Sequence, residues 1–166
     1  VILARRAVSL DPTSSRLKQV LAQSLWTSGR AEEAIKIIEQ GIESNPSTAN
    51  NFSLLSRWSL QLGQPGNALI YAIQERHLDP DNPNRQWAVC LMYFQLWNAE
   101  RGNRCGQKVL EKFPDYYEAK SWLATASGEN AIDLVKSQIA RFPNEPYYRL
   151  QLANELVGQM RYHEVE

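Results

Sequence analysis

The sequence predicts an all-α fold made of repeated pairs of antiparallel helices. Pro12, Pro46, Pro80 and Pro114 follow one another at a constant spacing of 34 residues. Small and aliphatic residues recur at the same spacing, and the stretches between them have the apolar periodicity of amphipathic helices. A fixed period of this length is the signature of a protein in which each repeat is one supersecondary unit.

The repeating positions carry side chains of two sizes. Each unit has an aliphatic residue followed by a small one in its first half, and a single small residue in its second half. The first set is Leu21 with Ala22, Leu55 with Ser56 and Val89 with Cys90, and the second is Ala34, Ala68 and Gly102. Small residues on two neighbouring helices allow their backbones to approach closely, since side-chain size sets the distance between helix axes. We therefore expect these positions at the contacts between helices.

Taken in order, the helices begin with residues 1–10, which form the second helix of an incomplete unit. Residues 15–26 and 32–42 form the first complete pair, because apolar residues recur there at intervals of three and four. Gly29 and Gly63 fall about midway through their units, where a glycine ends the first helix. The proline that closes each unit cannot continue the second helix.

The third unit departs from this pattern. Trp97 stands where the first two units have glycine, and Gly102 and Gly106 lie inside the expected second helix. Each of these glycines costs about 1 kcal/mol of helix propensity. A bulky neighbour that needs the space would explain them, and Trp122 is the candidate. The repeat is expected to be least regular between residues 97 and 131.

A deletion of five residues follows. Pro143 comes 29 residues after Pro114 instead of 34, and the step from Leu123 to Leu152 is also 29. The missing residues therefore belong between positions 124 and 131, where we expect a shortened helix and a tight turn.

The whole chain, 1–166, is interpreted as one array. Its units are 1–12 (partial), 13–46, 47–80, 81–114, 115–143 (short) and 144–166 (partial). The sequence has no starting methionine, and neither end shows the polar capping helix that a free-standing array needs. We therefore expect an internal segment of a longer protein, with open ends that favour end-to-end self-association.

Composition disfavours two classes of protein. The 18 basic and 18 acidic side chains give a formal net charge of zero, whereas a nucleic-acid binder is expected to carry a basic excess on one face. No stretch approaches the eighteen or so apolar residues of a membrane-spanning helix. The sequence thus predicts neither a nucleic-acid partner nor a membrane span.

No group of residues indicates catalysis. His77 and His163 lack a second metal ligand at helical spacing. Residues 79–84, "DPDNPN", resemble the start of a calcium loop, but the twelfth position, which needs glutamate, is Cys90. We expect no catalytic residue, no metal site and no cofactor, and the chain is not predicted to be an enzyme.

The chain has two cysteines, Cys90 and Cys105, which are too few for a disulfide framework. Cys90 occupies a small-residue position and is interpreted as a small buried hydrophobe. A disulfide between the two is the alternative, since they fall on the facing helices of one unit.

This arrangement resembles the tetratricopeptide repeat family, whose 34-residue helix-turn-helix units stack into a right-handed superhelical solenoid. The family's pattern of leucine, small residue, glycine, alanine and proline is matched in two units. The matching residues are Leu21, Ala22, Gly29, Ala34 and Pro46, and then Leu55, Ser56, Gly63, Ala68 and Pro80. The resemblance covers almost the whole chain.

The resemblance also implies a binding surface, because the first helices of such units line the concave face of the solenoid. The residues expected there offer aromatic and aliphatic side chains, amides and one cation. They are Gln19, Gln23, Trp26, Arg57, Leu60, Trp87, Leu91 and Phe94. Three of them, Trp26, Leu60 and Phe94, occupy equivalent positions of successive units. The alternative is that these three side chains pack against neighbouring helices instead.

The sequence therefore predicts a scaffold that binds a protein or peptide in the concave groove. The residues of the known clamp for chaperone tails, and the asparagine ladder of the nucleocytoplasmic glycosyltransferase, are both missing from the matching positions. A second hypothesis is a regulatory or targeting arm of a larger enzyme whose catalytic domain lies outside this segment. An RNA-binding helical repeat is disfavoured by the zero net charge.

Overall fold

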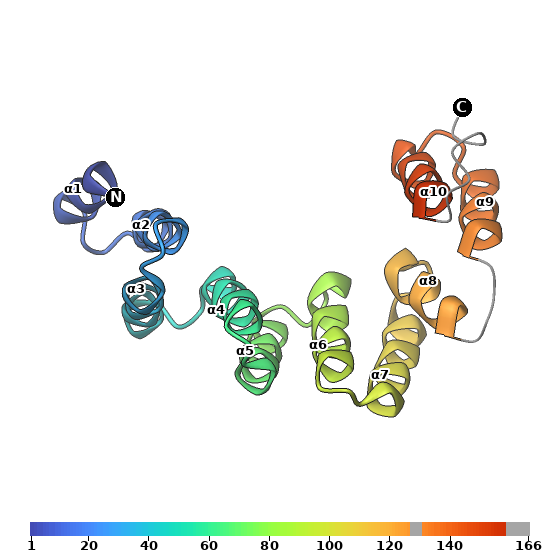
Figure 1. Cartoon of the computed structure of the whole chain (residues 1–166), viewed down its shortest axis with the longest axis horizontal. Coiled ribbons are helices and arrows are strands. Elements are labelled where there is room, and N and C mark those ends of the chain that lie inside the picture. Colours follow the sequence, from blue (N-terminus) through green and yellow to red (C-terminus); the bar gives the residue numbers. More distant parts are fainter. Residues whose placement is uncertain (127–130, 159–166) are drawn as a thin grey trace. The chain divides into compact units, whose positions relative to one another are not determined.

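The fold is all-α across the residues that the computed structural model describes, 1–126 and 131–158, as the sequence predicts (Figure 1). The helices are α1 (Ile2–Leu10), α2 (Ser15–Thr27), α3 (Ala31–Ser44), α4 (Ala49–Gln61), α5 (Pro65–Leu78), α6 (Pro83–Gln95), α7 (Ala99–Lys112), α8 (Tyr117–Ala126), α9 (Ala131–Arg141) and α10 (Pro146–Gly158). The repeating prolines stand just after α1, α3, α5 and α7, where each second helix ends.

The chain forms two compact units, residues 1–102 and residues 103–166. The first contains α1 to α6 and the first turn of α7. The second contains the rest of α7 together with α8, α9 and α10. No helix in the described part of the chain is long and apolar enough to cross a membrane.

Small residues lie at the helix contacts of the first unit, as expected from their spacing. Ala22, Ala34, Ala68 and Cys90 are fully buried. The hydroxyl of Ser56 donates to the backbone carbonyl of Ala68 at 2.9 Å, and this buried hydrogen bond joins α4 to α5.

Two apolar clusters hold these helices together. The first lies between α2, α3 and α4, and includes Leu25, Ile38, Leu55 and Trp58. The second lies between α5 and α6, where Ala72, Val89 and Met92 form part of the buried centre. Removal of this apolar surface from water is the main force that stacks one helix pair on the next.

The turns within the pairs share one backbone geometry. The N–H of Gly29 donates to the carbonyl of Trp26 at 3.0 Å, and the N–H of Gly63 donates to that of Leu60 at 2.9 Å. Both glycines have positive φ, 75° and 71°, as in the helix-ending motif that favours glycine.

Trp97 adopts this glycine conformation. Its φ is 57°, and its N–H donates to the carbonyl of Phe94 at 2.9 Å. The left-handed conformation costs a residue with a Cβ roughly 1–2 kcal/mol, so the third turn keeps the geometry of the first two at the expense of local strain. The departure seen in the sequence is one of residue type, and the turn itself is regular.

Gly102 makes room for Phe94, and the prediction that Trp122 is its bulky neighbour is wrong. A Cβ built on Gly102 would lie 2.5 Å from Cζ and 2.7 Å from Cδ1 of the Phe94 ring, far inside van der Waals contact. The glycine therefore allows α7 to lie directly against an aromatic side chain of α6.

The second unit contains two short helices. α8 has 10 residues and α9 has 11, whereas α2 to α7 have 13 or 14. Residues 127–130 lie outside the described part of the chain. The position of the five-residue deletion and the bounds of the repeat units therefore stay predictions, and the end of the last partial unit, 159–166, also lies outside the described residues.

Candidate functional site

The eight residues predicted to line the groove lie on α2, α4 and α6, the first helices of three successive pairs. α2 carries Gln19, Gln23 and Trp26; α4 carries Arg57 and Leu60; α6 carries Trp87, Leu91 and Phe94. Their side chains differ greatly in exposure, so they do not form one continuous surface.

One row of this set faces solvent. Gln23 and Arg57 are exposed, and Leu91, at the equivalent position of α6, is half-buried. Among the described residues, the Arg57 guanidinium has no hydrogen bond or ion pair. By contrast, Arg5 and Arg30 both pair with Glu33, at 3.0 Å and 2.6 Å. Arg57 is thus an available cation in the middle of the row.

Trp26 and Leu60 flank this row and are half-buried. The Trp26 ring stacks on Trp58, with centroids 4.6 Å apart and planes 3° apart. Leu60 packs against the second apolar cluster. Both side chains therefore contribute to packing between helices, and they offer only part of their surface to a partner.

Gln19 is engaged within the protein. Its Nε2 donates to Oδ1 of Asn51 at 2.7 Å, which joins α2 to α4. Asn51 is 1% exposed and lies against Gly41, where an added Cβ would be 3.1 Å from the Asn51 amide nitrogen. The role of Gln19 is therefore to fix the position of one first helix against the next.

Trp87 is 5% exposed, so it does not provide the groove surface that its position in the repeat suggested. Its ring lies 6.3 Å from that of Phe94 at an interplanar angle of 57°. The two aromatic residues are seven positions apart, so they lie on the same side of α6. Phe94 is half-buried and also lies against Gly102. For this pair, packing is the better interpretation.

Sequence reasoning missed an ionic cluster between α5 and α6. Arg85 lies 3.4 Å from a carboxylate oxygen of Glu75 and 3.1 Å from one of Asp79. Glu75 is 8% exposed. Burial raises the pKa of its carboxyl group, and the nearby Arg85 guanidinium partly opposes this shift. The cluster joins two helices through buried charge, and no spacing in the sequence pointed to it.

No group of three or more potential metal ligands occurs in residues 1–126 and 131–158. His77 is exposed, and His163 lies outside the described residues. Cys90 and Cys105 are both disulfide-bonded. Cys90 is fully buried, as its small-residue position predicted, and it is disulfide-bonded, as in the alternative interpretation.

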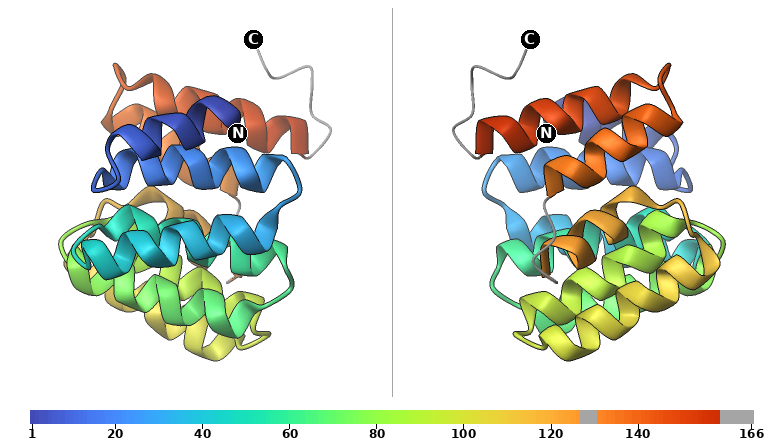
Figure 2. Two further views of the ribbon diagram at one scale, coloured as in Figure 1. Left: turned by 90° about the vertical axis from the view of Figure 1, so that its left-hand side faces the viewer. Right: turned by 90° about the vertical axis from the view of Figure 1, so that its right-hand side faces the viewer.

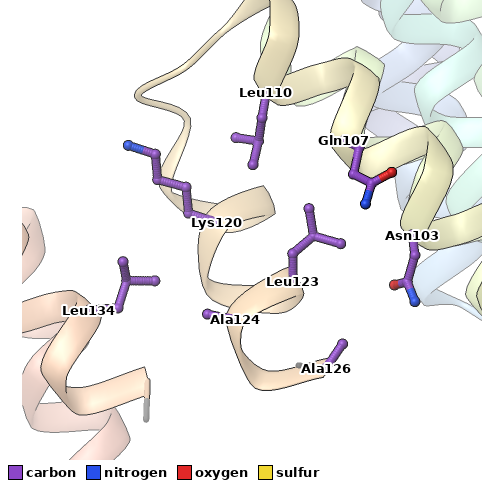
Figure 3. A pocket seen from close by; sticks show the side chains of 8 residues that line it. All are labelled: Asn103, Gln107, Leu110, Lys120, Leu123, Ala124, Ala126 and Leu134. Atoms are coloured by element: carbon purple, nitrogen blue, oxygen red, sulfur yellow. The ribbon is translucent and has the colours of Figure 1, made fainter. Parts of the chain in front are cut away.

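A pocket of about 450 Å³ opens within the second unit, between α7, α8 and the start of α9 (Figure 3). It is lined by Asn103, Gln107, Leu110, Lys120, Leu123, Ala124, Ala126 and Leu134. Leu123 points from α8 towards α7. The pocket reaches Ala126, the last described residue before 127–130, and no ligand is assigned to it. Apart from the expected shortening of the helices, no pattern in the sequence indicated this pocket.

Two solved structures of low sequence identity share this fold. A thermophilic TPR protein from Thermus thermophilus is 17% identical, with a TM-score of 0.67, and the match covers 94% of this chain and 88% of the other. The MamA protein is 15% identical, with a TM-score of 0.57 and coverage of 91% and 85%. No family model and no curated protein matches the sequence. In its fold, this chain is a tetratricopeptide-type helical repeat protein.

Proposed function

We propose that this chain is a protein-interaction scaffold that holds a segment of another polypeptide against α2, α4 and α6. The observation that carries the proposal is the row of Gln23, Arg57 and Leu91. These residues come from equivalent positions of three helix pairs, and the row has an unpaired cation at its centre. Repeat proteins use surfaces of this kind to bind extended partners.

The residues of the row define the chemistry of the partner. An arginine can bind a carboxylate through two parallel, charge-assisted hydrogen bonds, so the partner segment has an aspartate or glutamate opposite Arg57. Leu91 and the accessible part of Leu60 favour an apolar side chain beside that acid. Gln23 can both donate and accept hydrogen bonds with a peptide backbone. The proposed mechanism is binding, with no chemical step.

A library of random peptides displayed on phage tests this proposal. The wild-type chain is compared with Arg57→Glu and with Lys36→Glu as the matched control. Lys36 is exposed on α3, a second helix, so its charge reversal equals that of Arg57 but lies away from the row. Circular dichroism checks that all three proteins are equally helical.

The wild-type chain and Lys36→Glu are expected to enrich peptides that combine an acidic residue with a nearby apolar one. Arg57→Glu is expected to lose the acidic preference and to enrich lysine or arginine instead, because the local charge is reversed. The same enrichment with all three proteins would contradict the proposed site. No enrichment by the wild-type chain would contradict the peptide-binding function itself.

A further inference from the structure

The first helices of the first unit carry no acidic side chain. Neither α2, α4 nor α6 contains an aspartate or a glutamate, whereas α3 alone contains four glutamates. Within this unit α2, α4 and α6 lie in one layer, and α3 and α5 lie in the other (Figure 1). The layer of first helices therefore has side-chain charges of one sign, although the chain as a whole is neutral.

The basic side chains of this layer fall into two classes. Nζ of Lys18 donates to the hydroxyl of Ser44 at 2.9 Å, and Arg85 belongs to the ionic cluster between α5 and α6. Arg16 and Arg57 are exposed, and neither guanidinium has a hydrogen bond or ion pair to the described part of the chain. The layer therefore presents two available cations, one on α2 and one on α4.

The carboxylates beside this layer do not pair with either of these cations. Asp11, in the turn before α2, accepts from two backbone N–H groups of its own turn at 3.2 Å. Glu75 lies beside Ser53 of α4, but it is buried and faces Arg85. Asp81 is exposed in the turn before α6, so negative charge lies at the α6 end of the layer. An anionic group of a partner therefore fits best against α2 and α4.

Arg16 lies on the same side of α2 as Gln23, the first residue of the row described above. The two are seven positions apart, or about two helical turns, and Val20 lies between them. All three side chains are exposed, that of Val20 to 47%. The surface of the row thus continues along α2, past an aliphatic side chain, to a second cation.

Two contacts fix the register of α2 against α4. Gln19 donates to Asn51, and the ring of Trp26 stacks on that of Trp58, so residues 32 positions apart lie opposite each other. Successive helices of this unit run in opposite directions (Figure 2, left), so these two first helices are parallel. This register places Arg57 level with position 25 of α2.

The separation of the two cations follows from the register. Position 25 is nine residues beyond Arg16, which is about 14 Å along the helix axis. With packed helix axes about 9 Å apart, the Cα atoms of Arg16 and Arg57 are about 16 Å apart. An extended chain covers that distance in about five residues.

We propose that the partner held by this surface is an extended segment with two acidic residues about five positions apart, one bound by Arg57 and the other by Arg16. Each arginine binds its carboxylate through two parallel hydrogen bonds. An apolar residue between the two acids contacts Val20. This specificity rests on the proposed function and deepens it, because Arg16 and Val20 join the residues that decide which segments bind.

A nucleic acid is the less favourable anionic partner. Its backbone carries a phosphate at every nucleotide, and its affinity grows with the number of phosphates that lysine or arginine neutralises. Arg16 and Arg57 would neutralise two of them, and Val20 would have no apolar partner. Two separated carboxylates with an apolar residue between them match this surface in both charge and polarity.

Phage-displayed peptides with defined acid spacing test the inference on the whole chain. One library holds two aspartates two to nine positions apart among random residues, and a second holds a single aspartate. The baits are the wild-type chain, Arg16→Gln and Arg57→Gln. Arg101→Gln is the matched control, because Arg101 is exposed on α7, outside the layer of first helices. Circular dichroism checks that all four proteins are equally helical.

The wild-type chain and Arg101→Gln are expected to enrich two aspartates about five positions apart with an apolar residue between them. Arg16→Gln should still enrich one acidic residue beside an apolar one, but without a preferred position for a second acid. Arg57→Gln should likewise retain a preference for one acid only. The preferred spacing requires both cations, whereas a preference for a single acid requires one.

The most enriched peptide then enters a double-mutant cycle. Replacement of one of its aspartates by asparagine should weaken binding to the wild-type chain about three- to tenfold, since a charge-assisted pair is lost. The replacement that faces Arg16 should have no further effect on Arg16→Gln. Coupling of this kind identifies a contact, which a merely structural role of Arg16 would not produce.

Four outcomes would overturn the inference. Equal enrichment of the two libraries by the wild-type chain would leave the proposed function intact and remove the role of Arg16. Enrichment of two aspartates at every separation alike would contradict the register. Tighter binding of a single-stranded RNA than of the best peptide, weakened in Arg16→Gln, would assign both arginines to phosphates. No enrichment from either library would contradict the proposed function itself.

Discussion

Trp26 of α2 and Trp58 of α4 stack face to face, with ring centroids 4.6 Å apart and planes 3° apart. Trp58 is 2% exposed, whereas Trp26 keeps part of its surface in solvent. The stack joins the first helices of two neighbouring pairs, so a residue predicted to bind a partner also helps to hold the repeat together.

Trp58→Ala is expected to lower the free energy of unfolding by about 3–5 kcal/mol, because it removes a buried ring and leaves a cavity beneath Trp26. Denaturant unfolding followed by circular dichroism measures this loss. Trp97→Ala serves as the comparison, since Trp97 is 97% exposed and its removal should cost no stability. Equal losses at the two positions would contradict the assignment of Trp58 to the core.

Gly102→Ala is expected to destabilise the protein by about 1–3 kcal/mol, as overpacking usually does, because the added methyl group meets the Phe94 ring. Phe94→Leu should reduce this penalty, and a double-mutant cycle measures the coupling. Gly66→Ala is the matched control in a helix, because no atom lies within 4 Å of its added Cβ. Additive effects of the Gly102 and Phe94 substitutions would show that the two residues are not in contact.

Gly63→Ala isolates the effect of backbone conformation. No atom lies within 4 Å of a Cβ added to Gly63, but its φ is +71°. The variant should therefore lose about 1–2 kcal/mol through conformation alone, which chemical denaturation can measure. Gly63→Asn should lose less, since asparagine tolerates positive φ better than alanine does. Alanine and asparagine variants of equal stability would argue against conformational strain as the cause.

Glu75 should make stability depend on pH. Burial raises its pKa in the folded protein above the ordinary value of 4.5, so the folded state binds this proton more tightly than the unfolded chain does. The contribution of Glu75 to stability therefore falls as pH rises from about 4.5 through the folded pKa. Glu75→Gln cannot ionise, and we expect it to become more stable relative to the wild-type chain over this range.

Unfolding free energies of both proteins at several pH values from 4.5 upwards test this expectation. Only the difference between the two proteins is informative, because the other carboxyl groups titrate equally in both. A difference that stays constant with pH would show that Glu75 has the same pKa in the folded and unfolded states.

Much of the fold could be predicted because repetition shows the same physical constraint several times. Ala34 and Ala68 stand 34 residues apart and are fully buried at helix contacts, and so is Ala22, whose counterpart in the next repeat is Ser56. Gly29 and Gly63 likewise mark the turns. A constraint on backbone approach or on φ limits the residue type directly, so it can be read in a sequence.

The candidate site could be predicted only in part, because exposure depends on neighbouring helices. Arg57 and Trp87 were both expected in the groove, yet the first is exposed and the second is buried. Their positions within the repeat do not distinguish these outcomes. The burial of Trp87 depends on what packs around α6, and that packing differs from one unit to the next.

By itself, the sequence determined the helical class, the sites where helices end and the small residues at helix contacts, since each of these follows from local chain geometry. Only the tertiary structure decided which groove residues are accessible, that Phe94 occupies the space above Gly102, and that Glu75 is buried beside Arg85. It also showed that Trp97 adopts the positive φ of the turn glycines while its ring is exposed to solvent. These features depend on contacts between segments that a repeat pattern brings together but does not specify, because packing is decided by the shapes of all the neighbouring side chains at once.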